Sequence, residues 1–147
     1  MTAGPALQTL ILDLSERMAA IERQHAAAAD PPLAPPEMAA LRLLAQKGPV
    51  RMRDLASSLG LPPSSVTGLA DRLEGRALAE RRRVPGDRRT VHLDLAPQGR
   101  TLIEAVRAEQ AVVCDRLVES FGPAEAAVLR LLTRRFQSTP SEQGDDP

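Results

Sequence analysis

Five arginines lie within nine residues of this sequence, at positions 81–83, 88 and 89. A guanidinium group stays charged at physiological pH, binds phosphate oxygens and is weakly hydrated enough to enter a DNA minor groove. Pro85-Gly86-Asp87 supplies turn residues between the two groups, and the Asp87 carboxylate could fix the direction of Arg89 by a bidentate hydrogen bond. A run of charges is often a solvated surface, but arginines that flank a turn predict contact with a polyanion.

Few other residues could support covalent or metal chemistry. Cys114 is the only cysteine, so the chain forms no internal disulfide and a reducing compartment fits. It lies among Val112, Val113 and Leu117 in a predicted helix, and we expect it to be buried and inert. The two histidines, at positions 25 and 92, are too few and too separated to predict a metal site. We therefore expect no enzymatic activity and no cofactor.

The charge distribution favours an anionic partner for the middle of the chain. The 147-residue protein has zero net charge, yet residues 51–100 hold ten arginines against six acidic residues, a net of +4. The aromatic residues are Phe121 and Phe136, which argues against stacking of bases on rings. No segment resembles a signal peptide or a membrane span, so we expect a cytoplasmic protein without a membrane partner.

Proline and glycine breakers divide the sequence into helices, one hairpin and a polar tail. The predicted fold class is mainly α with a small β-hairpin wing. We expect one domain over residues 1–136 and a disordered tail at 137–147. The predicted helices cover residues 6–28, 36–47, 52–59, 63–75, 97–120 and 123–136, and the hairpin covers residues 78–95.

The second strand of the hairpin shows the period-2 alternation that is typical of a strand with one buried face. The predicted buried residues are Val91, Leu93 and Leu95, and the predicted exposed residues are Thr90, His92 and Asp94. Burial of the apolar set would anchor the hairpin and leave its arginines at the tip.

A helix-turn-helix is indicated by three residues at relative positions 0, +4 and +10. Ala56 is small enough for two helices to cross closely, Gly60 tolerates positive φ at the turn, and Val66 packs the second helix on the first. Two helices joined by an ordinary glycine turn are the alternative. The exposed start of the second helix would carry Ser64, Ser65 and Thr67, whose short hydroxyls suit close approach to phosphates and base edges.

The first predicted helix carries a heptad pattern of apolar residues. Its members are Leu7, Ile11, Leu14, Met18 and Ile21. The pattern indicates either an amphipathic helix on the protein's own core or a contact between subunits.

The segment GDRRTVHLDLAPQGR, residues 86–100, resembles the MarR family of winged-helix regulators. The most specific match is the D-x-R of the wing, at Asp87 and Arg89, followed by V-x-L at Val91 and Leu93. The similarity extends over about residues 7–136. It implies a homodimer in which helices 6–28 and 97–136 form the dimerisation body and residues 36–96 form a winged helix-turn-helix that binds double-stranded DNA.

The resemblance also implies roles for individual residues. It places Arg72 at a phosphate-contacting position of the recognition helix and Arg88 and Arg89 at a wing tip that enters the minor groove. The full predicted DNA-binding set is Ser64, Ser65, Thr67, Arg72, Arg83, Asp87, Arg88 and Arg89. The predicted dimerisation set is Leu7, Ile11, Leu14, Met18, Leu129, Leu132 and Phe136. A small-molecule effector and a repressor function are further expectations.

Several positions depart from the family pattern. Ala34, Pro62 and Ala96 stand where members often carry Ser or Thr as helix caps, although the prolines that follow help to preset the helical start. Ala77 occupies a usual glycine position, so a positive φ there would cost about 1 kcal/mol unless the helix ends earlier, at Gly75. These departures affect the helix boundaries and not the class.

Two other functions remain open on the sequence. A winged-helix domain can serve protein contact, in which case the hydroxyl face and the arginines could be changed without loss of function. A nucleoid protein could bind DNA without sequence preference, in which case operator and random DNA would bind alike.

Overall fold

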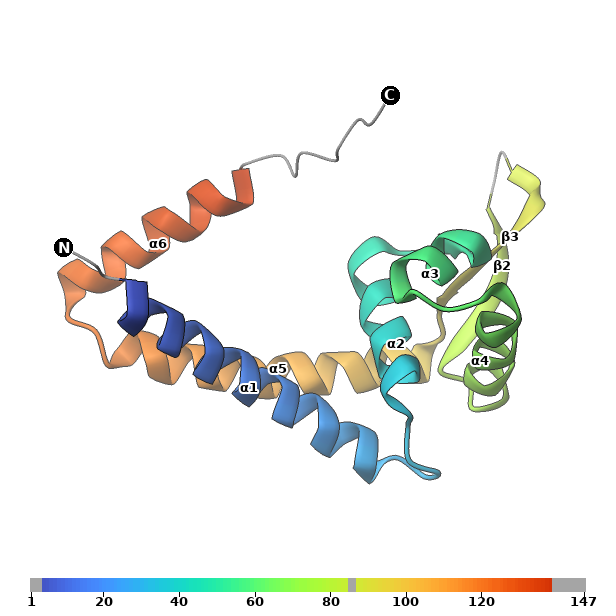
Figure 1. Ribbon diagram of the computed structural model, residues 1–147, viewed down its shortest axis with the longest axis horizontal. Helices are drawn as coiled ribbons and strands as arrows, with labels where there is room; N and C mark the ends of the chain where they lie inside the picture. Colours follow the sequence, from blue (N-terminus) through green and yellow to red (C-terminus); the bar gives the residue numbers. More distant parts are fainter. Residues whose placement is uncertain (1–3, 85–86, 139–147) are drawn as a thin grey trace. The chain divides into compact units, whose positions relative to one another are not determined.

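The computed structural model describes the backbone of residues 4–84 and 87–138 and the side chains of residues 8–83 and 90–131. The described chain is mainly helical with a small antiparallel sheet, which confirms the predicted fold class (Figure 1). It forms two compact units, Met1–Gln110 and Ala111–Pro147. The elements are α1 (Gly4–Ala28), α2 (Pro35–Lys47), β1 (Val50–Arg51), α3 (Met52–Leu59), α4 (Pro63–Gly75), β2 (Ala79–Val84), β3 (Asp87–Leu95), α5 (Pro97–Glu119) and α6 (Pro123–Ser138).

The helix boundaries follow the local signals closely. Helices α3 and α4 have the predicted bounds, and α2 and α5 differ from them by one residue. Helix α1 begins two residues earlier, at Gly4, and α6 continues two residues further, to Ser138. The predicted tail beyond this point lies outside the described residues. No helix within the described ranges combines the length and apolar character needed to cross a bilayer.

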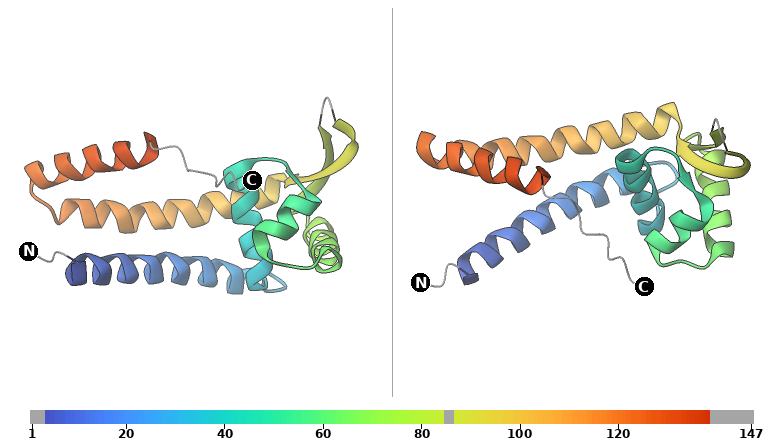
Figure 2. Two further views of the ribbon diagram at one scale, coloured as in Figure 1. Left: turned by 45° about the horizontal axis from the view of Figure 1, so that its top comes forward. Right: turned by 90° about the horizontal axis from the view of Figure 1, so that it is seen from above.

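Helices α2, α3 and α4 and the sheet gather into one lobe, residues 35–95, which we call the winged lobe (Figure 2). Its helix-turn-helix is confirmed at the three diagnostic positions. Ala56 and Val66 are buried, and Gly60 ends α3 in the left-handed conformation with φ of 62°. The core of the lobe is aliphatic, as expected from a sequence with two aromatic residues. Its largest fully buried side chains are Leu41, Leu44, Leu55, Val66, Leu69, Leu73 and Leu93.

The wing differs from the prediction in its number of strands. The sheet has the order β1-β3-β2, because Val50 and Arg51 pair with Leu93 and His92 in an antiparallel ladder. A two-residue strand has no period of its own, so β1 could not be recognised in the sequence. The pairing makes β3 the central strand.

The predicted alternation along β3 is wrong at three residues. Leu93 and Leu95 are buried as expected, but Val91 is 40% exposed while His92 and Asp94 are 8% and 3% exposed. His92 lies opposite Arg51 on one side and Arg82 on the other, and long arginine stems can cover a neighbour on the same sheet face. Central position in the sheet therefore buries both faces at this end of β3. The Nδ1 atom of His92 has no hydrogen-bond partner among the described residues.

The start of α5 is held against the wing by close backbone contact. A Cβ atom on Gly99 would lie 2.0 Å from the carbonyl oxygen of Leu78, and that oxygen also accepts the N–H of Ala96 at 3.1 Å. Only a glycine permits this approach. Further along α5, Glu109 meets His25 of α1 at 2.9 Å, and Gln110 donates to the Met18 carbonyl at 3.3 Å.

In the second unit, the exposure of Cys114 corrects the expectation of a buried thiol. Val113 and Leu117, four residues apart on α5, are half-buried. Cys114 is turned by one residue, about 100°, from that stripe, and Val112 is exposed as well. An apolar neighbourhood in sequence did not define the buried face of this helix.

Candidate DNA interface

Helix α4 presents one buried and one exposed face. Val66, Leu69, Ala70 and Leu73 follow the i, i+3, i+4, i+7 spacing and are buried in the core of the winged lobe. Ser64, Ser65 and Thr67, near the helix start, are exposed. Pro62 caps the helix without a side-chain bond, and Pro63 occupies the first helical position, where its missing N–H has no cost. The predicted hydroxyl face is therefore available at the N-terminal half of α4.

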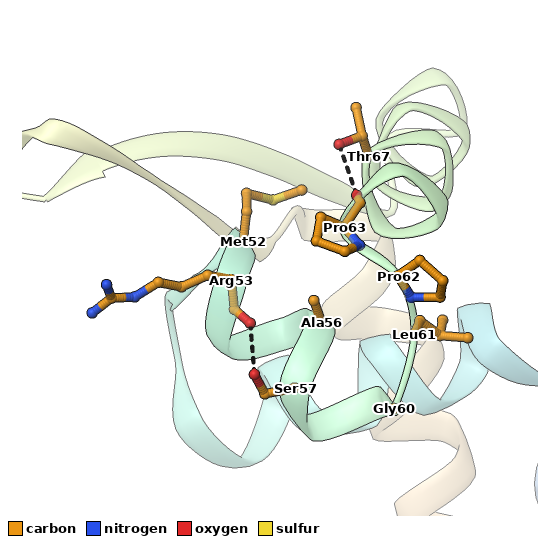
Figure 3. Close-up of a pocket in the computed structure, with 9 residues that line it drawn as sticks. All are labelled: Met52, Arg53, Ala56, Ser57, Gly60, Leu61, Pro62, Pro63 and Thr67. Carbon is orange, nitrogen blue, oxygen red and sulfur yellow. Dashed lines mark hydrogen bonds between the residues drawn. The ribbon is translucent and has the colours of Figure 1, made fainter.

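A hollow of about 580 Å³ lies where α3, the Gly60 turn and α4 meet (Figure 3). The Thr67 hydroxyl donates to the Pro63 carbonyl at 3.1 Å, and the Ser57 hydroxyl donates to the Arg53 carbonyl at 3.2 Å. Both donors are thus used inside their own helices. Thr67 is left with its methyl group and oxygen lone pairs for an external contact. The Arg53 side chain extends away from the hollow (Figure 3).

Arg72 on α4 is paired with a buried carboxylate. Its Nε donates to Oε1 of Glu37 at 2.7 Å, and the Arg72 side chain remains 59% exposed while that of Glu37 is 6% exposed. The second oxygen of Glu37 accepts the N–H of Ala34 at 2.9 Å and so caps α2, where alanine replaces the usual Ser or Thr.

The surroundings of Glu37 keep it ionised. Burial by itself would raise the pKa of this carboxyl, but the hydrogen bonds from Arg72 and Ala34 and the charges of Arg72 and Arg76 outweigh burial and lower it. The Arg72–Glu37 contact is therefore an ion pair at neutral pH.

Two of the clustered arginines have partners inside the lobe. Arg81 contacts Glu74 and Asp71 of α4, the latter at 2.8 Å, and its backbone N–H donates to Glu74 at 2.8 Å. The hydrogen bond to Asp71 raises the pKa of Arg81 further, and Glu74 adds to this. Arg82 pairs with Glu80, and with the buried Asp94 at 3.4 Å. The Arg81 contacts join the wing to α4, whereas those of Arg82 lie within the wing. Both sets use charge that the sequence alone would assign to DNA.

The tip of the wing lies largely outside the described residues. The backbones of Asp87, Arg88 and Arg89 open β3, and Val84 pairs with Asp87, with an irregularity in the ladder between Arg82 and Val84. The Pro85-Gly86 turn and the predicted aiming of Arg89 by Asp87 fall outside the described part. Arg83 is exposed on β2, and no ion pair joins it to another described side chain.

The predicted dimerisation residues lie on α1 and α6. Ile11 is 54% exposed, whereas Leu14, Met18 and Leu129 are half-buried. The side chains of Leu7, Leu132 and Phe136 are not among those described. Exposure along α1 falls toward its C-terminal end, where Ile21 is buried within the first unit.

The comparisons with known proteins agree with this geometry. The profile of the MarR family matches residues 33–91, which span the helix-turn-helix and most of the wing. The uncharacterized HTH-type transcriptional regulator YsmB of Bacillus subtilis (strain 168) is 30% identical over 105 residues, covering 71% of this chain and 72% of the relative. The chain belongs to the MarR family. The resemblance seen in the wing sequence is thereby confirmed.

Two further relatives match a larger share of this MarR-family chain. The HTH-type transcriptional repressor NicR of Pseudomonas putida is 28% identical over 124 residues, which cover 84% of this chain and 77% of NicR. The crystal structure of RV1404 from Mycobacterium tuberculosis matches with a TM-score of 0.69 and 28% identity, over 94% of this chain and 95% of that one. As a MarR-family member, the protein is a DNA-binding transcriptional regulator.

Sequence reasoning missed Glu37. Its spacing of three residues from Ala34 is that of a capping box, a signal that could have predicted its bond to the helix start. No local signal joins it to Arg72, which is 35 residues away. Sequence reasoning did anticipate Arg72 and the hydroxyl face, and all four side chains are exposed on α4.

Proposed function

We propose that this MarR-family protein acts as a homodimer that binds a pseudo-palindromic operator and represses transcription, and that a small ligand releases it. The observation that carries the proposal is the exposed hydroxyl face of α4, opposite a fully buried face, in the part of the chain with a net charge of +4. Similarity to the repressor NicR supports the sign of regulation. Because the partner is DNA, we place the protein in the cytoplasm.

A two-fold dimer would present two copies of α4 to the DNA. For successive major grooves on one side of B-DNA, the two helices must lie roughly 34 Å apart, one helical turn. Each α4 would read a half-site, and each wing would reach an adjacent minor groove through Arg88 and Arg89. The operator is then expected to be an inverted repeat.

Exposed apolar residues support the dimer. Of the large hydrophobic side chains that are two-fifths or more exposed in the described part, one lies on the wing and the others on α1, α5 and α6. Monomeric soluble proteins rarely expose large contiguous apolar patches, and three of these residues are consecutive on α1. The exposed residues outside the wing are Leu10, Ile11, Leu12, Val112, Val128 and Leu131.

Two cavities in the first unit support an effector site. One, of about 470 Å³, lies between the end of α1, the following loop and α2, and the other, of about 80 Å³, lies between α1, α2 and α5. Glu22, Met38 and Arg42 line both of them. Arg42 donates to Glu22 at 2.9 Å, so an acidic ligand could compete with Glu22 for this guanidinium. An effector would be recognised by raising the melting temperature while weakening operator binding.

Selection of bound DNA with the purified protein tests the function directly. We expect an inverted repeat that binds at least about 10³-fold more tightly than random DNA, with affinity that falls steeply as salt rises. Equal affinity for selected and random DNA would instead indicate a nucleoid protein. An affinity independent of salt would contradict binding through the basic middle of the chain.

The wing tip is tested by Arg89→Ala. Loss of a minor-groove arginine should weaken operator binding by about 1–3 kcal/mol and leave folding and dimer mass unchanged. Arg130→Ala, which removes an exposed charge on α6, is the matched control and should bind as the parent does. Unchanged binding by Arg89→Ala would remove the wing tip from the interface and favour a protein-contact function.

A further inference from the structure

Glu37 connects the first turn of α2 to the recognition helix through a single carboxylate. One oxygen accepts the Ala34 N–H at 2.9 Å, and the other accepts Nε of Arg72 at 2.7 Å. Both contacts are made by a side chain that is 6% exposed. We propose that Glu37 is a positioning residue for DNA binding, which sets the direction of the Arg72 guanidinium through their ion pair.

The geometry leaves most of the guanidinium free to bind DNA. The contact to Glu37 uses Nε, so the two terminal nitrogens, with four of the five N–H donors, are not needed for it. The Arg72 side chain is 59% exposed, whereas Glu37 is hidden behind it. Phosphate can therefore approach Arg72 from the solvent side while Glu37 holds it from the protein side.

Gly68 helps to define where the guanidinium lies. A terminal nitrogen of Arg72 is 3.5 Å from the place that a Cβ on Gly68 would occupy, one turn nearer the start of α4. The side chain therefore folds back along the helix, toward the half that exposes Ser65 and Thr67. An unpaired arginine on a helix surface would instead sample several rotamers, and ordering it on binding would cost entropy.

A second contact holds the same end of α4. Arg76, at the C-cap, donates to the Pro31 carbonyl of the α1–α2 loop at 2.5 Å, and its charge helps to keep Glu37 ionised. The α1–α2 loop and the start of α2 are thus tied to α4 at two arginines, of which Arg72 is the one predicted to face phosphate. The inference rests on the proposed operator binding and adds to it the residue that orients this contact.

A double-mutant cycle on the full-length protein tests the proposal, with the selected operator as the probe. The variants are Glu37→Gln, Arg72→Ala and the two combined, measured by fluorescence anisotropy. We expect Arg72→Ala to weaken binding about 10-fold and to lower the slope of log affinity against log salt by about 1. Glu37→Gln should weaken binding about 3- to 10-fold, and should have less than about a 2-fold effect when Arg72 is already alanine.

Glu16→Gln is the matched control. It removes the acid from the exposed Arg23–Glu16 ion pair, which lies within α1 at 2.5 Å without touching α4, and operator affinity should not change. Because Glu37 also caps α2, melting curves of all variants set a temperature at which each is folded.

The outcomes distinguish failure of the Glu37 proposal from failure of the proposed operator binding. A Glu37→Gln effect of the same size with and without Arg72 would overturn the proposal, since Glu37 would then act through the fold alone. Unchanged or tighter binding by Glu37→Gln would overturn it as well, as would unchanged binding by Arg72→Ala. In each of these cases the parent still prefers its operator. If the parent shows no preference for any DNA, the proposed function itself fails.

Discussion

Individual arginines in the winged lobe have two kinds of role. Residues 51–100 hold ten arginines, yet Arg81 and Arg82 bind acidic side chains of the lobe and Arg76 binds a backbone carbonyl. Such contacts hold α4, the wing and the α1–α2 loop together. The number of phosphate contacts should therefore be smaller than the number of arginines. The slope of log affinity against log salt should accordingly be smaller than ten arginines would give.

Thr67 offers a test of what the recognition helix reads. Because the Thr67 hydroxyl donates to the Pro63 carbonyl, we expect the Thr67 methyl group to make the contact with DNA. Its partner in the major groove would be the methyl group of a thymine. Thr67→Val keeps that methyl and should bind the selected operator within about 0.5 kcal/mol of the parent, whereas Thr67→Ser should lose about 0.5–1 kcal/mol. Anisotropy titrations give both values, and the reverse order would show that the hydroxyl makes the contact.

Ala77 is a strained position that a glycine would relieve. Its φ is 54°, and the bonds from Ala77 N–H to Glu74 and from Leu78 N–H to Leu73 form a Schellman motif in which glycine is usual. The positive φ considered from the sequence is thus present at Ala77, although α4 ends at Gly75. Ala77→Gly should raise the free energy of unfolding by about 0.5–1 kcal/mol.

The control for this prediction has the opposite sign. Ala105→Gly, at an exposed interior position of α5, should lower the free energy of unfolding by about 0.5–1 kcal/mol. Urea denaturation measures both variants. Destabilisation by Ala77→Gly would mean that the strain inferred from φ is absent.

Between elements, a close backbone approach joins the start of α5 to Leu78, the residue before β2. Gly99 sits in the first turn of α5 with the Leu78 carbonyl and the Leu95 side chain beside it, so the helix cannot rotate without breaking the Ala96–Leu78 hydrogen bond. This contact fixes how α5 leaves the winged lobe within the first unit. Helix α5 leads out of the winged lobe. It can transmit a structural change from one of its ends to the other only if its starting direction is fixed.

Gly99→Ala should destabilise the protein by more than about 2 kcal/mol, because the obstacle is backbone and cannot rotate away. Gly75→Ala is the matched control, since a Cβ there meets nothing within 4 Å and alanine favours the helix by up to about 1 kcal/mol. Thermal unfolding distinguishes the two. A Gly99→Ala protein as stable as the parent would show that α5 shifts easily at its start.

For the molecule as a whole, the exposed apolar residues bear on the association of two chains, which the core of one chain does not. Helix α1 exposes Leu10, Ile11 and Leu12, which a single chain leaves in water. A second copy offers the same surfaces and, by two-fold symmetry, two recognition helices. Dimerisation would thus bury the exposed apolar surface and also supply the two recognition helices that an inverted repeat requires.

Ile11→Asp tests the dimer. Ile11 is 54% exposed in one chain, so aspartate there should leave the protomer folded while reducing dimer mass in sedimentation and weakening operator binding. Val91→Asp, at an exposed apolar position of the wing, should keep the dimer. A stable dimer of the Ile11→Asp variant would exclude this part of α1 from the interface.

Features that depend on neighbours in the chain could be predicted from the sequence. Pro63 and Gly60 set the boundaries of α3 and α4, and the 0, +4, +10 spacing of Ala56, Gly60 and Val66 indicated how they cross, because a turn and a crossing need particular residues at short separations. The hydroxyl face of α4 followed from the same periodicity.

Contacts between distant segments required the tertiary structure. His92 and Asp94 are buried against the predicted alternation. His92 lies between Arg51 of β1 and Arg82 of β2, and Asp94 is paired with Arg82 of β2 and Arg100 of α5. The ion pair of Glu37 with Arg72 and the approach of Gly99 to Leu78 likewise join elements that no local pattern relates. Polarity and period describe a residue's own element, whereas burial and ion pairing depend on which element folds against it.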